Sequence, residues 1–153
     1  MDSASYSEEL NAFLVEAFND ILKTEELAVT EQYPELSIRE VHVIEAVCRA
    51  VDQGGDNRAS AIAATLRVTA GTLTTSVNQL EAKGYLERVR DRNDKRSVRL
   101  RPTEKGREAE RRHREFHQEM VADVVARLSP EETEILVRGL GSITAFFRDK
   151  YRI

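Results

Sequence analysis

The stretch that decides the fold is residues 68–101, VTAGTLTTSVNQLEAKGYLERVRDRNDKRSVRLR. Its first half has apolar residues at three- and four-residue spacing, which is the period of a helix with one buried face. These apolar residues are Leu73, Val77 and Leu80. Thr69 is a favourable N-cap residue, and Gly84 is a favourable residue just beyond a helix end. The first half therefore predicts a helix that Thr69 caps and that runs to Lys83.

The second half of the stretch predicts a basic β-hairpin. Polar and apolar residues alternate over residues 85–90 and 97–101, and the polar run 91–94 between them is typical of a turn. The basic residues of the hairpin are Arg88, Arg90, Arg92, Lys95, Arg96, Arg99 and Arg101. Arginines on a rigid β-ribbon can bind the phosphate backbone of DNA or enter a narrow minor groove.

A short helix over residues 58–66 precedes the stretch, and residues 67–69 predict a tight turn between the two helices. A helix, a turn, a second helix and a basic hairpin, in that order, make a winged helix-turn-helix. The outward side of the second helix carries small or uncharged residues, which suit close approach to base edges in a major groove about 12 Å wide. We therefore expect DNA contacts from Thr69, Ala70, Gly71, Thr74, Thr75, Asn78, Arg90, Lys95, Arg96 and Arg99.

Long helices flank this DNA-binding lobe, which we place at residues 37–101. Apolar periodicity predicts them over about residues 7–29, 103–128 and 129–150. Within the lobe, Ser37 with Glu40 three positions later predicts the start of another helix. A helix of about 20 residues spans about 30 Å, which is too long for so small a lobe to cover. The sequence therefore predicts one mostly α (α+β) domain over residues 1–153 whose long helices form a homodimer.

The net charge of −4 conceals a segregation of charge along the chain. Residues 58–101 contain ten Lys or Arg and four Asp or Glu, whereas the rest of the chain contains thirteen and twenty-three. A local basic patch, rather than the charge of the whole molecule, attracts phosphates. The charge distribution therefore favours double-stranded DNA as the partner.

Composition and motifs argue against several other classes of protein. No apolar run reaches the roughly 18 residues of a membrane span, and the N-terminal residues lack a secretory pattern, so we expect a cytoplasmic protein with no membrane contact. Cys48 is the single cysteine; it excludes an internal disulfide framework and, on an inward helix face, predicts a structural thiol. No P-loop, dinucleotide fingerprint or G-x-S-x-G motif predicts an enzyme. A winged-helix module that binds proteins instead of DNA remains as an alternative.

The sequence resembles the MarR family of bacterial regulators over nearly its whole length. The resemblance rests on VTAGTLTTSV (68–77), LEAKGYLER (80–88) and DKRSVRL (94–100). The wing signature of that family has an Asp two positions before an Arg, here Asp94 and Arg96, which adds Asp94 to the expected DNA-binding residues. Pro102 departs from the family, which usually has Leu before the residue that corresponds to Thr103. The resemblance implies a homodimer with interleaved terminal helices, and repression as the commoner mode of action.

Two resemblances within the family leave the effector open. The segments GTLTTS (71–76) and HREFHQEM (113–120) resemble regulators of fatty-acid synthesis that respond to acyl carrier protein, which implies an acyl-chain, carrier-protein or small-molecule effector. Glu26, His42, His113 and His117 resemble the ligands of zinc-responsive members that regulate metal uptake, and the two helical His four residues apart share one face. In a third interpretation, these residues form only a polar junction or exposed imidazoles without a metal.

Overall fold

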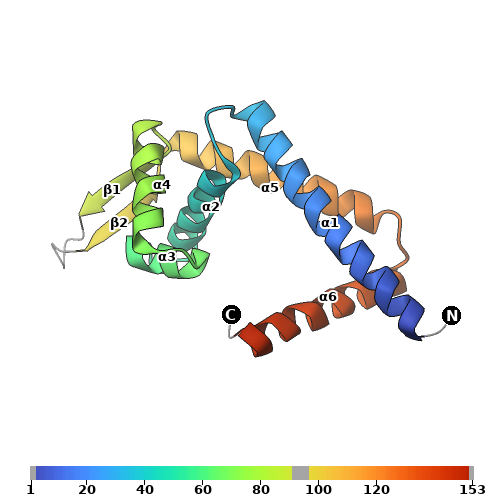
Figure 1. The fold of residues 1–153 in the computed structure, drawn as a ribbon. Coiled ribbons are helices and arrows are strands. Elements are labelled where there is room, and N and C mark those ends of the chain that lie inside the picture. Colours follow the sequence, from blue (N-terminus) through green and yellow to red (C-terminus); the bar gives the residue numbers. More distant parts are fainter. Residues whose placement is uncertain (1–2, 91–96, 152–153) are drawn as a thin grey trace. The chain divides into compact units, whose positions relative to one another are not determined.

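The computed structural model of the chain describes residues 3–90 and 97–151. The described residues form six α-helices and one antiparallel pair of strands (Figure 1). In chain order these elements are α1 (Ser3–Gln32), α2 (Ile38–Asp52), α3 (Ala59–Leu66), α4 (Ala70–Ala82), β1 (Leu86–Arg90), β2 (Val98–Pro102), α5 (Glu104–Val125) and α6 (Pro130–Tyr151). The predicted fold class, a mostly α winged helix-turn-helix with long terminal helices, is confirmed. Within these two ranges, no helix combines the length and the apolar character that a membrane crossing requires.

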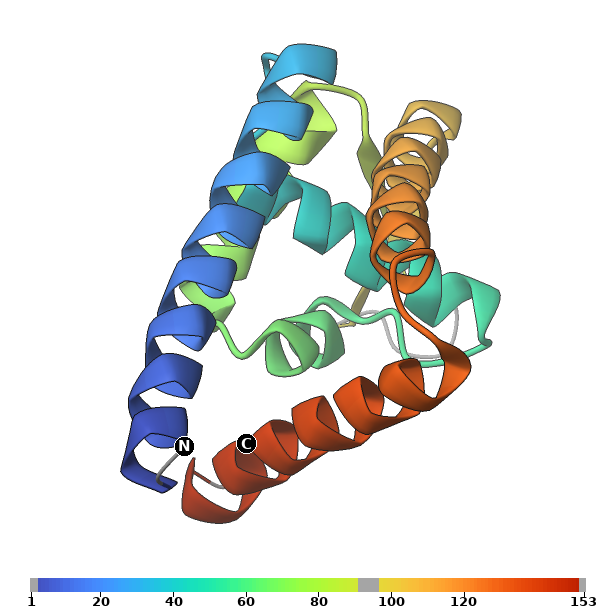
Figure 2. The same cartoon turned by 90° about the vertical axis from the view of Figure 1, so that its right-hand side faces the viewer.

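The chain consists of two compact units. The first unit ends at His113 and the second begins at Arg114, so the boundary falls inside α5. In the first unit, α2, α3 and α4 contact one another and the hairpin (Figure 1). Figure 2 shows α2 and α3 of this unit from another side. The most deeply buried side chains of this unit are Val41, Ile44, Val47, Cys48, Ile62, Val77, Leu80, Tyr85 and Leu100. They include Cys48, Val77 and Leu80, which the sequence places on inward helix faces, and the third inward position of α4, Leu73, is also buried.

The long helices differ from the prediction mainly at their ends. α1 begins at Ser3, four residues before the expected start, and α5 ends at Val125, three residues before the expected end. α6 begins at Pro130 as expected, and Ser129 caps it by accepting the Glu132 N–H at 3.2 Å. Helix ends fray easily, so differences of this size are ordinary.

Ser37 and Glu40 form the predicted capping box at the start of α2. The Ser37 N–H donates to Glu40 Oε2 at 2.8 Å, and the Glu40 N–H donates to Ser37 Oγ at 3.3 Å. Lys83, just after α4, donates to the other carboxylate oxygen of the buried Glu40 at 2.7 Å. Burial alone would raise the pKa of Glu40, but the bonds from Lys83 and Ser37 outweigh it, and the pKa is lowered. The cap therefore also ties α2 to the end of α4.

The turn between α3 and α4 is as short as the sequence predicts. Arg67 adopts the left-handed conformation, with φ +55°, and its N–H donates to Ala64 O at 3.1 Å. Thr69 then caps α4, because its hydroxyl oxygen accepts the Thr72 N–H at 3.1 Å. A single residue, Val68, thus separates the C-cap of α3, Arg67, from the N-cap of α4, Thr69, and the Val68 N–H donates to Ala63 O at 3.0 Å.

Gly84 ends α4 as predicted. Its φ is +79°, a value that residues with a side chain rarely adopt. The Gly84 N–H donates to Glu81 O at 3.0 Å, and the Tyr85 N–H donates to Leu80 O at 2.8 Å. These paired bonds are those of a Schellman motif, which reverses the chain direction at a helix end. The chain therefore passes directly from α4 into the hairpin.

The hairpin has one difference from the prediction, at Pro102. Sequence alternation predicts that the second strand ends before Pro102, whereas Pro102 is the last residue of β2 and lies opposite Leu86. A proline has no N–H to donate, so it fits a strand only at an end or an edge. The next residue, Thr103, donates its N–H to Tyr85 O at 3.0 Å and continues the pairing.

A close contact between Gly106 and Tyr85 fixes the start of α5. A Cβ atom built on Gly106 would lie 2.2 Å from Tyr85 O. Thr103 Oγ1 donates to Gly84 O at 2.7 Å and accepts the Gly106 N–H at 3.1 Å. These contacts place the start of α5 directly against the turn that ends α4, where Tyr85 is fully buried.

Substituting Gly106 with alanine should lower the free energy of unfolding by about 1–3 kcal/mol, because the added methyl group would overlap a buried carbonyl. Urea denaturation measures the change as a lower midpoint with an unchanged slope. Gly71→Ala is the matched control, since a Cβ atom there meets nothing closer than 3.9 Å. If Gly106→Ala is as stable as the control, the contact does not constrain the fold.

Candidate nucleic-acid interface

The outward face of α4 carries the residues that the sequence predicts to contact DNA. Leu73, Val77 and Leu80 are buried, so helix geometry turns the opposite side to solvent. The residues on that exposed side are Ala70, Gly71, Thr74, Thr75 and Asn78, together with the cap residue Thr69. None of these side chains is charged, which permits close approach to base edges.

The two threonines in the middle of this face direct their hydroxyl protons into the helix. Thr74 Oγ1 donates to Ala70 O at 2.8 Å, and Thr75 Oγ1 donates to Gly71 O at 3.1 Å. A hydroxyl whose proton is engaged still offers its lone pairs as acceptors. The threonines thus present acceptors and methyl groups, which suit the amino group of cytosine and the methyl group of thymine.

The structure describes part of the predicted wing. Arg90 is exposed on β1. Arg99 on β2 is half-buried, and its Nη1 donates to Asn57 Oδ1 at 2.8 Å. Asp94, Lys95 and Arg96 lie outside the described residues, so their contacts with DNA stay a prediction.

Asn57 fastens β2 to the loop before α3, a role that nothing in the local sequence indicates. Its Nδ2 donates to Leu100 O at 2.9 Å, and its backbone oxygen accepts the Leu100 N–H at 2.9 Å. Its Oδ1 holds Arg99, and Arg58 forms an isolated β-bridge with Arg99. Asn57 and Leu100 are 43 residues apart in the chain, so only the folded structure identifies this contact.

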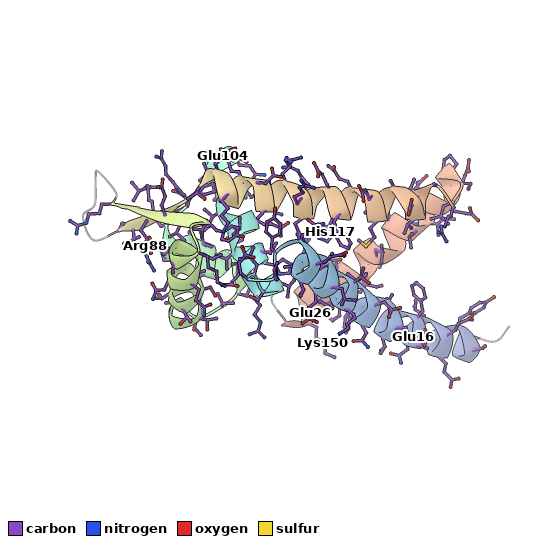
Figure 3. All side chains as sticks on the ribbon, turned by 90° about the horizontal axis from the view of Figure 1, so that it is seen from above. Glu16, Glu26, Arg88, Glu104, His117 and Lys150 are labelled. Atoms are coloured by element: carbon purple, nitrogen blue, oxygen red, sulfur yellow. The ribbon has the colours of Figure 1, made fainter. Side chains whose placement is uncertain are left out.

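Arg88 connects β1 to α4 (Figure 3). Its Nη2 donates to Asn78 Oδ1 at 2.7 Å, and its Nη1 forms an ion pair with Glu81. The Arg88 backbone N–H also donates to Glu81 Oε1 at 3.0 Å. A side-chain network, in addition to the turn at Gly84, therefore sets the orientation of the hairpin against α4.

Tyr85 anchors the same region to the segment before α2. Its hydroxyl donates to Glu35 Oε1 at 2.5 Å, and Lys105 Nζ of α5 lies 4.1 Å from the centre of its ring. Burial, followed by the bond to Glu35, raises the pKa of Tyr85, while the bond from Tyr85 lowers the pKa of Glu35. Both shifts indicate that the tyrosine stays protonated and the glutamate stays charged near neutral pH, so the bond persists.

Of the four residues that resemble zinc ligands, the structure brings His42 and His113 together. Their ring centres are 5.8 Å apart, and His113 Nδ1 lies 3.1 Å from Glu45 Oε1. Glu26 is exposed on α1, whereas the neighbouring Glu25 is 6% exposed and has a carboxylate oxygen within 4.8 Å of a ring nitrogen of His113. Adjacent residues on a helix point about 100° apart, which explains why Glu25 rather than Glu26 lies near His113.

His117, the fourth of these residues, is half-buried one turn beyond His113 on α5. Cys48 is buried on α2, as the sequence predicts for a structural thiol. Burial raises the pKa of Cys48 to about 11, so the reactive thiolate is scarce near neutral pH.

Comparisons with known proteins agree with this geometry. Residues 36–106 match the winged helix DNA-binding domain family. The crystal structure of FabT from Streptococcus pneumoniae in complex with DNA is 38% identical, covers 94% of this chain and 98% of that chain, and has a TM-score of 0.86. The crystal structure of a MarR family transcription regulator is 15% identical and shares the fold over 99% of both chains, with a TM-score of 0.79.

A curated relative covers a smaller part of the chain. YwhA from Bacillus subtilis, an HTH-type transcriptional regulator by its description, is 39% identical over 59 residues. These residues are 39% of this chain and 42% of YwhA. The chain thus spans less than half the length of this relative.

Replacing Asn57 with alanine should loosen the wing while leaving the core folded. We expect affinity for DNA to fall about tenfold, which is about 1.4 kcal/mol, and the free energy of unfolding to fall by about 1–2 kcal/mol from the lost hydrogen bonds. Fluorescence anisotropy and urea denaturation measure the two effects. Asn57→Asp is the control, since it keeps the acceptor for Arg99 and should lose less affinity than Asn57→Ala. Unchanged DNA affinity in Asn57→Ala would show that Asn57 does not position the wing.

Proposed function

Because the chain belongs to the MarR family of winged helix-turn-helix transcriptional regulators, we propose that it represses transcription by binding a pseudo-palindromic operator as a homodimer. The observation that carries this proposal is the uncharged outward face of α4 beside an arginine-bearing hairpin. Such a helix reads base edges in the major groove, while the hairpin contacts the phosphate backbone. The segregated charge of the chain orients this face toward the duplex.

Exposed apolar side chains support the homodimer. Phe13, Phe18 and Leu22 of α1 are each more than half exposed. In α6, Leu140 and Phe146 are 49% and 52% exposed. A single chain rarely leaves so much large apolar surface in water unless a partner covers it. A second copy of the chain covers these faces in the proposed dimer, and they belong to the helices that the sequence predicts to dimerise.

A twofold dimer presents two copies of α4 to one face of a duplex. Helix-turn-helix dimers bind half-sites about one helical turn, roughly 34 Å, apart, so the operator is an inverted repeat. The resemblance to repressors of fatty-acid synthesis, together with 38% identity to FabT, supports fatty-acid synthesis genes as the target. The corresponding effector is an acyl chain, free or bound to acyl carrier protein.

In-vitro selection of bound duplexes from a random pool tests this function. We expect enrichment of an inverted repeat with half-sites about ten base pairs apart, and a changed affinity when long-chain acyl carrier protein is added. A pool without enrichment, at low salt and with effector present, would contradict a sequence-specific regulator. An enriched motif without twofold symmetry would contradict the dimer alone.

A zinc-responsive regulator of metal uptake is a second candidate, which His42 and His113 support. Zinc binds imidazole nitrogen and carboxylate oxygen, and Glu25 offers a buried carboxylate near His113. Glu45 faces His113 Nδ1, as carboxylates do that orient zinc-bound histidines. Zinc held by these residues would join α2 to α5 and so stabilise one orientation of the DNA-binding lobe.

Zinc titration of the chelator-treated protein, followed by desalting and metal analysis, tests this candidate. We expect about one zinc per protomer, lost when His113→Ala and His117→Ala are combined. Glu25→Gln should weaken zinc binding, whereas the matched control Glu26→Gln should bind zinc like wild type, since Glu26 is exposed. Absence of bound zinc after saturation would end this alternative.

A further inference from the structure

The side-chain amide of Asn78 is held in one orientation, and this orientation restricts which base it can read. We propose that Asn78 selects a base edge that offers hydrogen-bond acceptors, guanine or thymine, and that Arg88 sets this preference. The inference rests on the proposed function, because it requires α4 to lie in the major groove. It adds a base preference at one step of each half-site.

The bond from Arg88 determines which end of the Asn78 amide faces the hairpin. Arg88 Nη2 lies 2.7 Å from Asn78 Oδ1. A guanidinium group has donors only, so the amide must turn its oxygen toward Arg88 and its Nδ2 group away. Within the described part of the chain, Asn78 Nδ2 makes no hydrogen bond, and the residue is exposed. Its two protons are therefore available to a base.

Glu81 keeps Arg88 in this position. Glu81 Oε1 accepts the Arg88 backbone N–H at 3.0 Å, and the Glu81 carboxylate forms an ion pair with Arg88 Nη1. The two side chains are 31% and 32% exposed, so water screens the pair only in part. Glu81 is thus a positioning residue, which acts on DNA only through Arg88 and Asn78.

Of Thr74, Thr75 and Asn78 on the outward face of α4, Asn78 is the residue that offers hydrogen-bond donors to DNA. Thr74 and Thr75 donate their hydroxyl protons to Ala70 O and Gly71 O, within the helix. They retain acceptors and methyl groups for the DNA. The amide protons of Asn78 therefore complement the threonines rather than duplicate them.

Each base edge responds differently to this pair of protons. The usual pairing of Asn with adenine is bidentate, since Nδ2 donates to N7 and Oδ1 accepts from N6. With Oδ1 turned to Arg88, the second of these bonds is lost. Guanine presents N7 and O6, and thymine presents O4, as acceptors, whereas cytosine presents an amino donor that would face Nδ2. The expected order is guanine or thymine, then adenine, with cytosine last.

In-vitro selection with wild type and three variants tests this order. Asn78→Ala identifies the step, as the position in the half-site whose preference disappears. At that step wild type should favour guanine or thymine over adenine by about tenfold, the discrimination that one good set of hydrogen bonds gives. Arg88→Met removes the donors and frees Asn78 Oδ1, so adenine should become equal or preferred. Arg88→Lys retains a donor and should preserve the wild-type order.

Because Arg88→Met also removes a contact between hairpin and α4, Glu81→Gln is a second test that leaves Arg88 in place. It weakens the ion pair, so adenine should gain by a smaller factor than in Arg88→Met. Preference for adenine in wild type, or no gain of adenine in either variant, overturns the inference. So does an Asn78→Ala profile identical to wild type, although the enriched operator would then still support the proposed function. If wild type enriches no motif, the proposed function itself fails, and the inference with it.

Discussion

The contact between Tyr85 O and Gly106 is the constraint on which the rest of the DNA-binding lobe depends. Tyr85 follows the turn that ends α4 and precedes β1, so its carbonyl lies where the helix, the hairpin and α5 meet. Because Gly106 has no side chain, α5 reaches this carbonyl, and Thr103 bonds both Gly84 O and Tyr85 O from the same place. The three elements therefore cannot move independently at this point. Because α4, the hairpin and α5 are already fixed relative to one another here, the DNA-binding surface loses little conformational entropy when DNA binds. A larger loss would weaken the association.

Two arginines of the hairpin are also fixed before DNA binds, because neighbouring side chains hold them in position. Glu81 and Asn78 bond Arg88, and Asn57 bonds Arg99. Each bond reduces the number of orientations that a long cationic side chain can adopt. The attraction of the hairpin for DNA phosphates depends on the summed positive charge of its side chains, so it persists when individual arginines are hydrogen-bonded within the protein. The same residues thus contribute attraction through their charge and positioning through their bonds.

Short-range bonds explain why the ends of the lobe's helices were predictable from sequence. Ser37 with Glu40, Thr69 and Gly84 all act through bonds within a few residues, so the residue types alone indicate them. The outward face of α4 was predictable for the same reason, since the burial of its other face follows the helical period. The Asn57 contacts were not, because they join segments 43 residues apart. On α1 the apolar period marks side chains that are mostly exposed in the structure, whereas the buried residues of this helix include Glu25 and Val29. The period therefore did not indicate which acidic residue faces the histidines, and Glu26 was expected where Glu25 lies.

The most direct test of the central claim, that α4 and the hairpin together bind DNA, is the salt dependence of affinity for the selected operator and for a scrambled duplex. Each neutralised phosphate adds about 0.9 to the slope of log affinity against log salt. The prediction is a slope of about −4 or steeper for a dimer on both duplexes. The operator should bind at least about a thousandfold more tightly than the scrambled duplex at physiological salt. Affinity that is independent of salt, or equal for the two duplexes, would contradict the claim.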